Sequence, residues 1–201
     1  MNGFEDFKRY LPQYLSPESQ EELYEGLKQF PEGFEDRMFS ARLMGEIDVF
    51  QGDGLRDMPV SNLPETTIVK GPVLILSNTC DTSSSNRRVK SPSIIYCPIV
   101  KLSRLEREYL DVGMSVDAVS DMLTSIRAQK TTRFFYLPKF GGLPDECVGL
   151  LDHVVSASMV LLANVSIPER RLFSLSNLGL YLFLVKLGIH FTRVLESVDR
   201  G

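Results

Sequence analysis

The sequence has only two histidines, His153 and His190, and this excludes a metal site built from several histidines. Its three cysteines, Cys80, Cys97 and Cys147, cannot all pair, so a disulfide framework is not expected. No secretory signal peptide is recognised at the start of the sequence. These features predict reduced thiols and a cytoplasmic protein. No closely spaced set of ligands such as C-x-x-C is present, and we expect neither a metal nor a cofactor.

The sequence also lacks an uninterrupted apolar run of about 20 residues, the length that a membrane-spanning helix needs. The most apolar stretch begins at Leu178, and Lys186 and His190 interrupt it. We expect a helix from about Asn177 to Val198 and no membrane association. Its apolar surface is too wide for packing on one side only, which predicts a homodimer.

The composition is that of a folded protein: 201 residues, of which 43% are apolar and 24% are charged. The net charge of −4 excludes a protein that binds nucleic acid through its overall charge. The charge is uneven, because residues 1–48 hold eleven Asp and Glu against five Lys and Arg. The rest of the chain has two more bases than acids. An acidic arm therefore precedes a weakly basic body.

The first part of the chain predicts helices. Ser16-Pro17-Glu18 is a typical helix start, because Ser caps the free N–H groups, Pro fits the first turn and Glu complements the helix dipole. Apolar residues follow at helical spacing until a Pro-Glu-Gly sequence ends the pattern. We expect a second short helix at residues 34–44.

From Gly45 onward, short runs of β-forming residues alternate with turns. We expect strands at residues 47–49, 73–76, 93–100, 131–137 and 148–155, and helices at residues 103–110 and from Ser115 onward. Short strands interrupted by helices predict an α+β protein, mainly β, built on a small antiparallel barrel or curled sheet. The two domains would be an acidic helical arm, residues 1–44, and a barrel with inserted helices and a C-terminal helix, residues 45–201.

Five motifs carry a resemblance to a known family. In chain order they are Gly45-Glu46-Ile47-Asp48-Val49, Pro72-Val73-Leu74-Ile75-Leu76-Ser77-Asn78, Tyr96-Cys97-Pro98-Ile99-Val100, Leu151-Asp152-His153-Val154 and Leu175-Ser176. Over about residues 45–195, this order resembles that of the MazF/PemK-type growth inhibitors of toxin–antitoxin systems. The resemblance implies an SH3-like antiparallel barrel with a long C-terminal helix.

The resemblance also implies an RNA-directed growth inhibitor or ribonuclease-like component of a toxin–antitoxin or phage-defence system. Its implied partners are RNA or an acidic, antitoxin-like protein segment. The toxins have an Arg before the Pro of the second strand and a Thr or Ser after the Pro-Ile step, where this chain has Gly71 and Val100. Metal-free RNA cleavage needs a base, an acid and a cation, so the question of an enzyme stays open.

The polar segment that follows Leu76 holds the candidate catalytic residues. Cys80 next to Asp81 is typical of a nucleophile beside an orienting acid, with His153 as the base that forms the thiolate. A second interpretation is structural, with a small buried cysteine, a turn-forming aspartate and a core histidine that bonds to the backbone. Both interpretations stay open at this point.

The candidate binding residues are Asn78, Lys70, Arg87 and Arg88, and we expect Lys101 to lie near them. A basic loop holds phosphates or an acidic partner, although charged loops also occur as plain solvated surface. Two hypotheses follow. One is an RNA-directed, toxin-like enzyme with relocated catalytic residues, and the other is a non-catalytic binding module of the same fold that binds a protein partner or nucleic acid.

Overall fold

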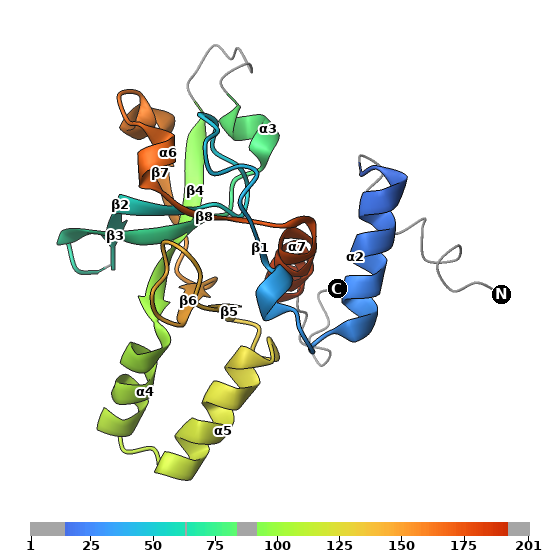
Figure 1. Cartoon of the computed structure of the whole chain (residues 1–201). Helices are drawn as coiled ribbons and strands as arrows, with labels where there is room; N and C mark the ends of the chain where they lie inside the picture. The colour runs from blue at the N-terminus through green and yellow to red at the C-terminus, as the bar shows by residue number, and fades with distance from the viewer. Residues whose placement is uncertain (1–14, 63, 84–91, 193–201) are drawn as a thin grey trace, which may run out of the picture.

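The computed structural model describes residues 15–62, 64–83 and 92–192. Its strands are β1 Phe39–Ser40, β2 Gly54–Ser61, β3 Ile68–Ile75, β4 Ser93–Lys101, β5 Phe134–Leu137, β6 Cys147–Leu150, β7 Val155–Ser158 and β8 Arg171–Leu175. Its helices are α2 Pro17–Gln29, α3 Thr79–Thr82, α4 Leu102–Asp111, α5 Val116–Arg127, α6 Ile167–Arg170 and α7 Asn177–Thr192, with short 3-10 helices η2 Glu35–Arg37 and η3 Met159–Leu162. The α4–α5 hairpin projects from one end of the sheet (Figure 1).

The strands form one sheet in the order β1-β8-β2-β3-β4-β6-β5. Every ladder among the described residues is antiparallel. β4 is central because it is long enough for three partners: it pairs with β3 on one side, and with β7 and then β6 along the other. The predicted α+β class with an antiparallel sheet is therefore confirmed.

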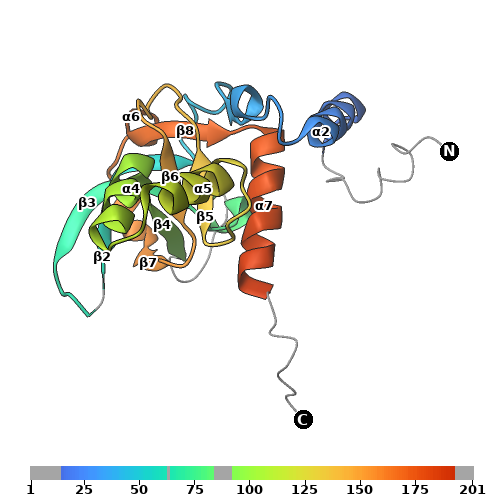
Figure 2. The ribbon, with the colours of Figure 1, turned by 90° about the horizontal axis from the view of Figure 1, so that it is seen from below.

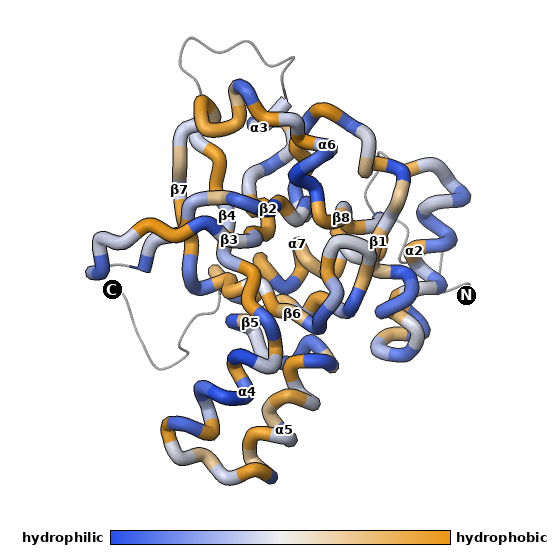
Figure 3. Tube along the Cα trace, turned by 60° about the vertical axis from the view of Figure 1, so that its left-hand side comes forward, coloured by the Kyte–Doolittle hydropathy of each residue, from blue (hydrophilic) through white to orange (hydrophobic). Residues whose placement is uncertain are grey.

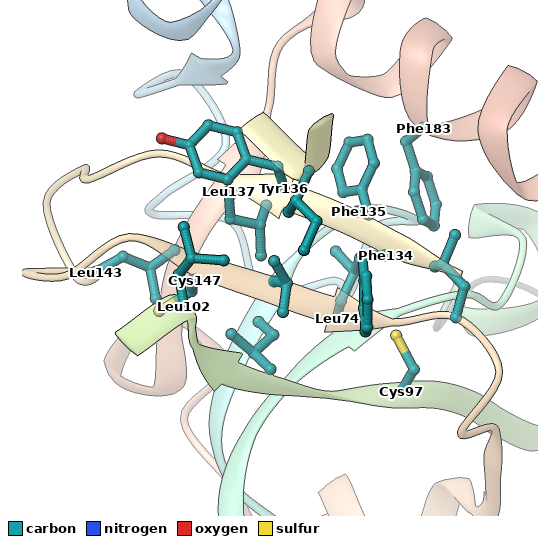
Figure 4. Packing of buried hydrophobic residues seen from close by; sticks show 14 of the residues in the cluster. Leu74, Cys97, Leu102, Phe134, Phe135, Tyr136, Leu137, Leu143, Cys147 and Phe183 are labelled. Atoms are coloured by element: carbon teal, nitrogen blue, oxygen red, sulfur yellow. The ribbon is translucent and has the colours of Figure 1, made fainter. Parts of the chain in front are cut away.

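The larger apolar core lies between the sheet and α7. Phe134, Phe135 and Tyr136 of β5 are buried, and the ring of Phe135 meets that of Phe183 from α7 at 5.1 Å between centroids (Figure 4). α4 and α5 add their buried faces to this cluster. Alternate residues of β3 enter a second, smaller cluster on its other face, so that β3 separates two apolar layers.

α7 buries a basic residue and exposes apolar ones. Lys186 is buried beside Phe183, whereas Ile189 and Phe191 are 50% and 60% exposed. The Lys186 ammonium donates to the backbone oxygen and to Oε1 of Gln129 at 2.9 and 2.7 Å, and burial lowers the pKa of Lys186 to about 7. Figure 3 shows hydrophobic residues recurring along α7 and hydrophilic ones along α4. In the described part of the chain, no helix is long and apolar enough to span a membrane.

The helix of the acidic arm packs against α7. Leu23 of α2 clusters with Leu178 of α7. Arg37 also fastens α2, because its guanidinium donates to the Glu22 carbonyl at 3.1 Å and to Gln29 Oε1 at 3.0 Å. Figures 1 and 2 both show α2 beside the start of α7.

Two local predictions next to the arm are wrong. The helix expected at residues 34–44 is only the single turn Glu35–Arg37, after which β1 pairs with β8. The strand expected at residues 47–49 does not form, and neither does the first strand that the family resemblance implies. Backbone oxygens of four residues from Leu43 to Asp48 instead accept hydrogen bonds from the guanidinium of Arg171.

Arg171 also forms a buried ion pair. Its Nε lies 3.0 Å from Oδ2 of Asp53, and the two side chains are 0% and 1% exposed. Burial raises the pKa of Asp53, while hydrogen bonds from the Ser174 hydroxyl and the Phe50 N–H and the charge of Arg171 oppose this rise. The pair fastens the irregular segment that precedes β2 onto β8.

The strand predicted at residues 148–155 is also wrong as a single element. A turn at residues 151–153 divides it into β6 and β7. Arg133 holds this turn, because its carbonyl accepts from the Leu151 N–H at 2.9 Å and its guanidinium pairs with Asp152 at 2.8 Å. His153 therefore lies on a turn and not on a strand as predicted.

Candidate functional site

Three of the predicted site residues lie together at α3. Asn78 caps this helix, with its Oδ1 accepting from the Cys80 N–H at 2.8 Å. Thr82 is buried and donates its hydroxyl to the Val49 carbonyl at 2.6 Å, which anchors the turn to the body. Cys80 is exposed and Asp81 is half-buried. The polar segment thus begins as a capped helical turn.

The other predicted site residues are spread over the chain. His153 is half-buried on the turn between β6 and β7. Lys70 is exposed on β3, opposite Pro59 of β2. Arg87 and Arg88 lie outside the described residues. Within the described ranges, no group of three or more His, Cys, Asp or Glu side chains is arranged to hold a metal ion. The catalytic role of Cys80, Asp81 and His153 stays a prediction.

Lys101 was expected near Arg87 and Arg88, and these two arginines lie outside the described residues. Lys101 is the last residue of the nine-residue strand β4. It contributes to a hollow at this end of the strand.

This hollow has a volume of about 320 Å³ and is called the β2–β4 pocket here. It is lined by residues of β2, β3, β4, β8 and the segment that leads into β6: Arg56, Pro72, Ile99, Lys101, Gly142, Leu143, Pro144, Asp145, Cys147 and Leu172. The floor is apolar, and the charged side chains stand at the rim. Ligand sites range from about 300 to about 1,000 Å³, so a pocket of this size suits one small planar group.

The wall of the pocket is held by close backbone packing. The Phe140 N–H donates to the Leu143 carbonyl at 2.9 Å and closes a tight turn. A Cβ atom on Gly142 would stand 2.6 Å from the Leu172 carbonyl oxygen, so that only glycine allows this approach to β8. Leu143 is 4% exposed, and Figure 4 shows it at the same end of the core as Leu102, the residue after Lys101.

The rim carries two cations and one carboxylate. Lys101 Nζ lies 2.6 Å from Oδ2 of Asp145, and the two side chains are 63% and 45% exposed. The bond with Asp145 raises the pKa of Lys101, so the ammonium stays protonated. Arg56 is exposed, with neither a hydrogen bond nor an ion pair to the parts of the chain that the structure describes. Burial raises the pKa of the Cys147 thiol to about 11, which keeps it neutral and unreactive.

Three lining residues of the pocket are sequence neighbours of the positions at which the chain departs from the toxins. Pro72 follows Gly71, and Val100 stands between Ile99 and Lys101. The resemblance implies an RNA-cleaving Arg and a phosphate-holding Thr or Ser at these two positions. Neighbouring side chains of an extended strand point to opposite faces, so position 100 does not share the face of Ile99 and Lys101.

Sequence reasoning missed Arg56 because it missed β2 altogether. The two buried apolar residues of β2, Leu55 and Met58, are three positions apart in the sequence, whereas the alternation of a regular strand needs an even spacing. The register with β3 shifts between them, and this irregularity allows the odd spacing. Pro59 further obscures the strand. Asp145 was missed because it follows a Gly-Gly-Leu-Pro turn and belongs to no motif.

A scan against protein-family models and a search of curated proteins both find no match to this chain. The chemistry of the β2–β4 pocket is therefore the basis on which a function can be proposed.

Proposed function

We propose that this chain is a divergent protein of the MazF/PemK type that binds single-stranded RNA in the β2–β4 pocket and acts as an RNA-directed growth inhibitor. One observation carries the proposal: an apolar hollow with cations at its rim is lined by Pro72, Ile99 and Lys101, the sequence neighbours of Gly71 and Val100. In this proposal the bent sheet corresponds to the SH3-like barrel of the toxins.

Single-stranded RNA offers the two kinds of group that this pocket suits. Its unstacked bases have apolar faces that pack on side chains, and its phosphates attract arginine. The floor residues Pro72 and Leu143 supply the apolar surface, and the planar guanidinium of Arg56 supplies two parallel donors for a phosphate.

A ribonuclease is the second candidate, favoured by the Lys101–Asp145 pair beside Val100. In this reaction the Asp145 carboxylate takes the proton of a 2′-hydroxyl, and the 2′-oxygen attacks phosphorus. The bond from phosphorus to the 5′-oxygen breaks, and Lys101 gives that oxygen a proton. The products are a 2′,3′-cyclic phosphate and a 5′-hydroxyl, and Arg56 balances the charge of the transition state.

The binding proposal is tested by fluorescence anisotropy with a labelled single-stranded RNA and the full chain. Arg56→Ala should weaken binding about five- to tenfold and reduce the slope of log K against log salt by about 0.7, because one phosphate contact is lost. Arg133→Ala is the matched control, since Arg133 is also an exposed arginine, 54% exposed, but pairs with Asp152 away from the pocket. Equal effects of both substitutions would contradict the proposed surface.

Expression of the full chain in a bacterial host separates the candidates. Growth arrest with RNA fragments that end in cyclic phosphate supports the ribonuclease. Growth arrest with intact RNA supports inhibition by binding. A chain that neither arrests growth nor binds RNA in the anisotropy assay contradicts both, and then the non-catalytic module that binds a protein partner is favoured.

A further inference from the structure

The β2–β4 pocket combines an apolar floor with one carboxylate and one ammonium group side by side. Lys101 and Asp145 lie at 2.6 Å from each other, and both remain accessible to solvent. The floor beneath them includes Ile99 and Leu143, which are 4% exposed each. A ligand that has an apolar surface together with a donor and an acceptor group therefore suits this pocket.

We infer that the β2–β4 pocket selects guanine in single-stranded RNA, with Asp145 accepting from N1–H and N2–H and Lys101 donating to O6. This inference rests on the proposed RNA-binding function. Guanine packs its face on the floor and turns its Watson–Crick edge to the rim, where bases of single strands are read.

The other three bases match the rim less well. Guanine alone presents two neighbouring N–H donors, which one carboxylate can accept together, next to a carbonyl oxygen for the ammonium. Adenine and cytosine place a ring-nitrogen lone pair next to their amino group, and this lone pair repels the second carboxylate oxygen. Uracil offers one N–H between two carbonyl oxygens, so the carboxylate meets an acceptor on either side.

Strand pairing holds the two rim residues in place. Lys101 is paired with Cys147 across the β4–β6 ladder. Asp145 precedes Cys147 by two residues, and the Leu102 N–H donates to the Glu146 carbonyl at 2.9 Å, which fixes the chain between them. The sheet thus fixes the backbones that carry the carboxylate and the ammonium.

The experiment uses the full chain and labelled octamers of uridine that carry one central guanosine, adenosine, cytidine or inosine. The guanosine octamer should bind roughly ten- to a hundredfold more tightly than the adenosine and cytidine octamers, the range that one bidentate contact provides. Inosine lacks the N2 amino group and should bind with intermediate affinity.

Asp145→Asn should abolish the preference for the guanosine octamer over the adenosine and cytidine octamers, because the amide turns a donor toward the N–H groups of guanine. Glu25→Gln is the matched control: Glu25 pairs with Lys28 at 2.9 Å on α2, with similar exposure, and its loss should leave the preference intact. Circular dichroism checks that both variants fold.

The outcomes separate the two proposals. If no octamer binds, the RNA-binding function itself is overturned. If all octamers bind equally, or if another base is preferred, RNA binding stands and the selection of guanine is overturned. A preference for guanosine that survives Asp145→Asn assigns the selection to another residue and also overturns the inference.

Discussion

Two pairs of a cation and a carboxylate share their chemistry but not their surroundings. Arg171 and Asp53 are 0% and 1% exposed, and their hydrogen bonds reach the backbone of the segment before β2. Lys101 and Asp145 are 63% and 45% exposed at the rim of the β2–β4 pocket. The hydrogen bonds of the first pair are made within the protein, whereas the second pair is accessible to solvent.

The difference teaches how burial divides roles between similar groups. A buried charge that loses its partner is strongly destabilising, so the Arg171–Asp53 pair fixes the fold. An exposed pair contributes about 0 to 1 kcal/mol, so the fold does not depend on Lys101–Asp145. Substitutions should therefore cost the most stability at the buried pair and the least at the exposed pair.

Arg171→Met should reduce the free energy of unfolding by about 3 to 5 kcal/mol, because Asp53 stays buried without its cation. Urea denaturation followed by circular dichroism measures this loss. Arg170→Met is the neighbouring control, since the Arg170 side chain makes a single hydrogen bond within the described residues, to the Asp57 carbonyl at 3.4 Å, and its loss should cost under about 0.5 kcal/mol.

If Arg171→Met does not fold, the double variant Arg171→Met with Asp53→Leu keeps the test decisive. Removal of both charges should restore folding in part, because apolar groups replace a buried pair better than one unpaired charge does. A loss below about 1 kcal/mol in the single variant would show that the pair is not structural.

Lys186 is a buried cation whose ammonium donates to Gln129 rather than to a carboxylate, and its effect on stability should depend on pH. Its pKa of about 7 in the folded chain lies below the usual value of 10.5, so the unfolded chain holds more protons between these values. The free energy of unfolding should therefore rise from pH 7 toward pH 10, by at most about 1.4 kcal/mol per unit. Lys186→Met should remove this rise in the free energy of unfolding, as measured by urea denaturation between pH 6.5 and 9.5. If the variant keeps the wild-type pH profile, this role of Lys186 is refuted.

Glu146 represents the intermediate case of a partly exposed carboxylate. The Arg127 guanidinium donates to the two carboxylate oxygens of Glu146 at 2.7 and 2.9 Å, and the Tyr136 hydroxyl donates to Oε1 at 2.7 Å. These hydrogen bonds lower the pKa of Glu146 to about 2. Because this value lies below the usual 4.5, the stability it contributes is present above pH 4.5 and is lost as the pH falls toward 2. Glu146→Gln should flatten the loss of stability between pH 5 and 3, measured by urea denaturation. An unchanged acid profile would count against this assignment.

The rim pair should have the smallest effect on stability. Lys101→Met and Asp145→Asn should each change the free energy of unfolding by less than about 0.5 kcal/mol, as measured in urea. Lys28→Met, in the equally exposed pair on α2, sets the scale for comparison. A loss above about 1 kcal/mol at the rim would mean that this pair serves the fold.

Local signals allowed the α4–α5 hairpin and β4 to be predicted. Ser115 caps α5 by accepting from the Ala118 N–H at 3.3 Å. Val119, Leu123 and Ile126 are buried on one face as their spacing predicts, whereas Val116, expected on the same face, is 73% exposed. These elements depend on residues within a few positions of one another, which a sequence displays directly.

The segment before β2 was not predictable in this way, because its partner is distant. Asp53 and Arg171 are 118 positions apart in the sequence. Only in the folded chain does the Arg171 guanidinium reach the backbone oxygens of this segment, such as that of Glu46, and oxygens bound in this way do not pair with a neighbouring strand. The pocket was missed for the same reason. Arg56, Lys101 and Asp145 come from three elements, and no spacing along the chain relates them.

The contact between Gly142 and β8 has a consequence for how this protein can evolve. Because no side chain is tolerated there, the backbone that carries Pro144 and Asp145 keeps its shape while the exposed rim residues change. Substitutions at the rim are therefore nearly neutral for folding. A lineage with this architecture can vary the charge and size of its rim side chains by single mutations, without first gaining stability to compensate.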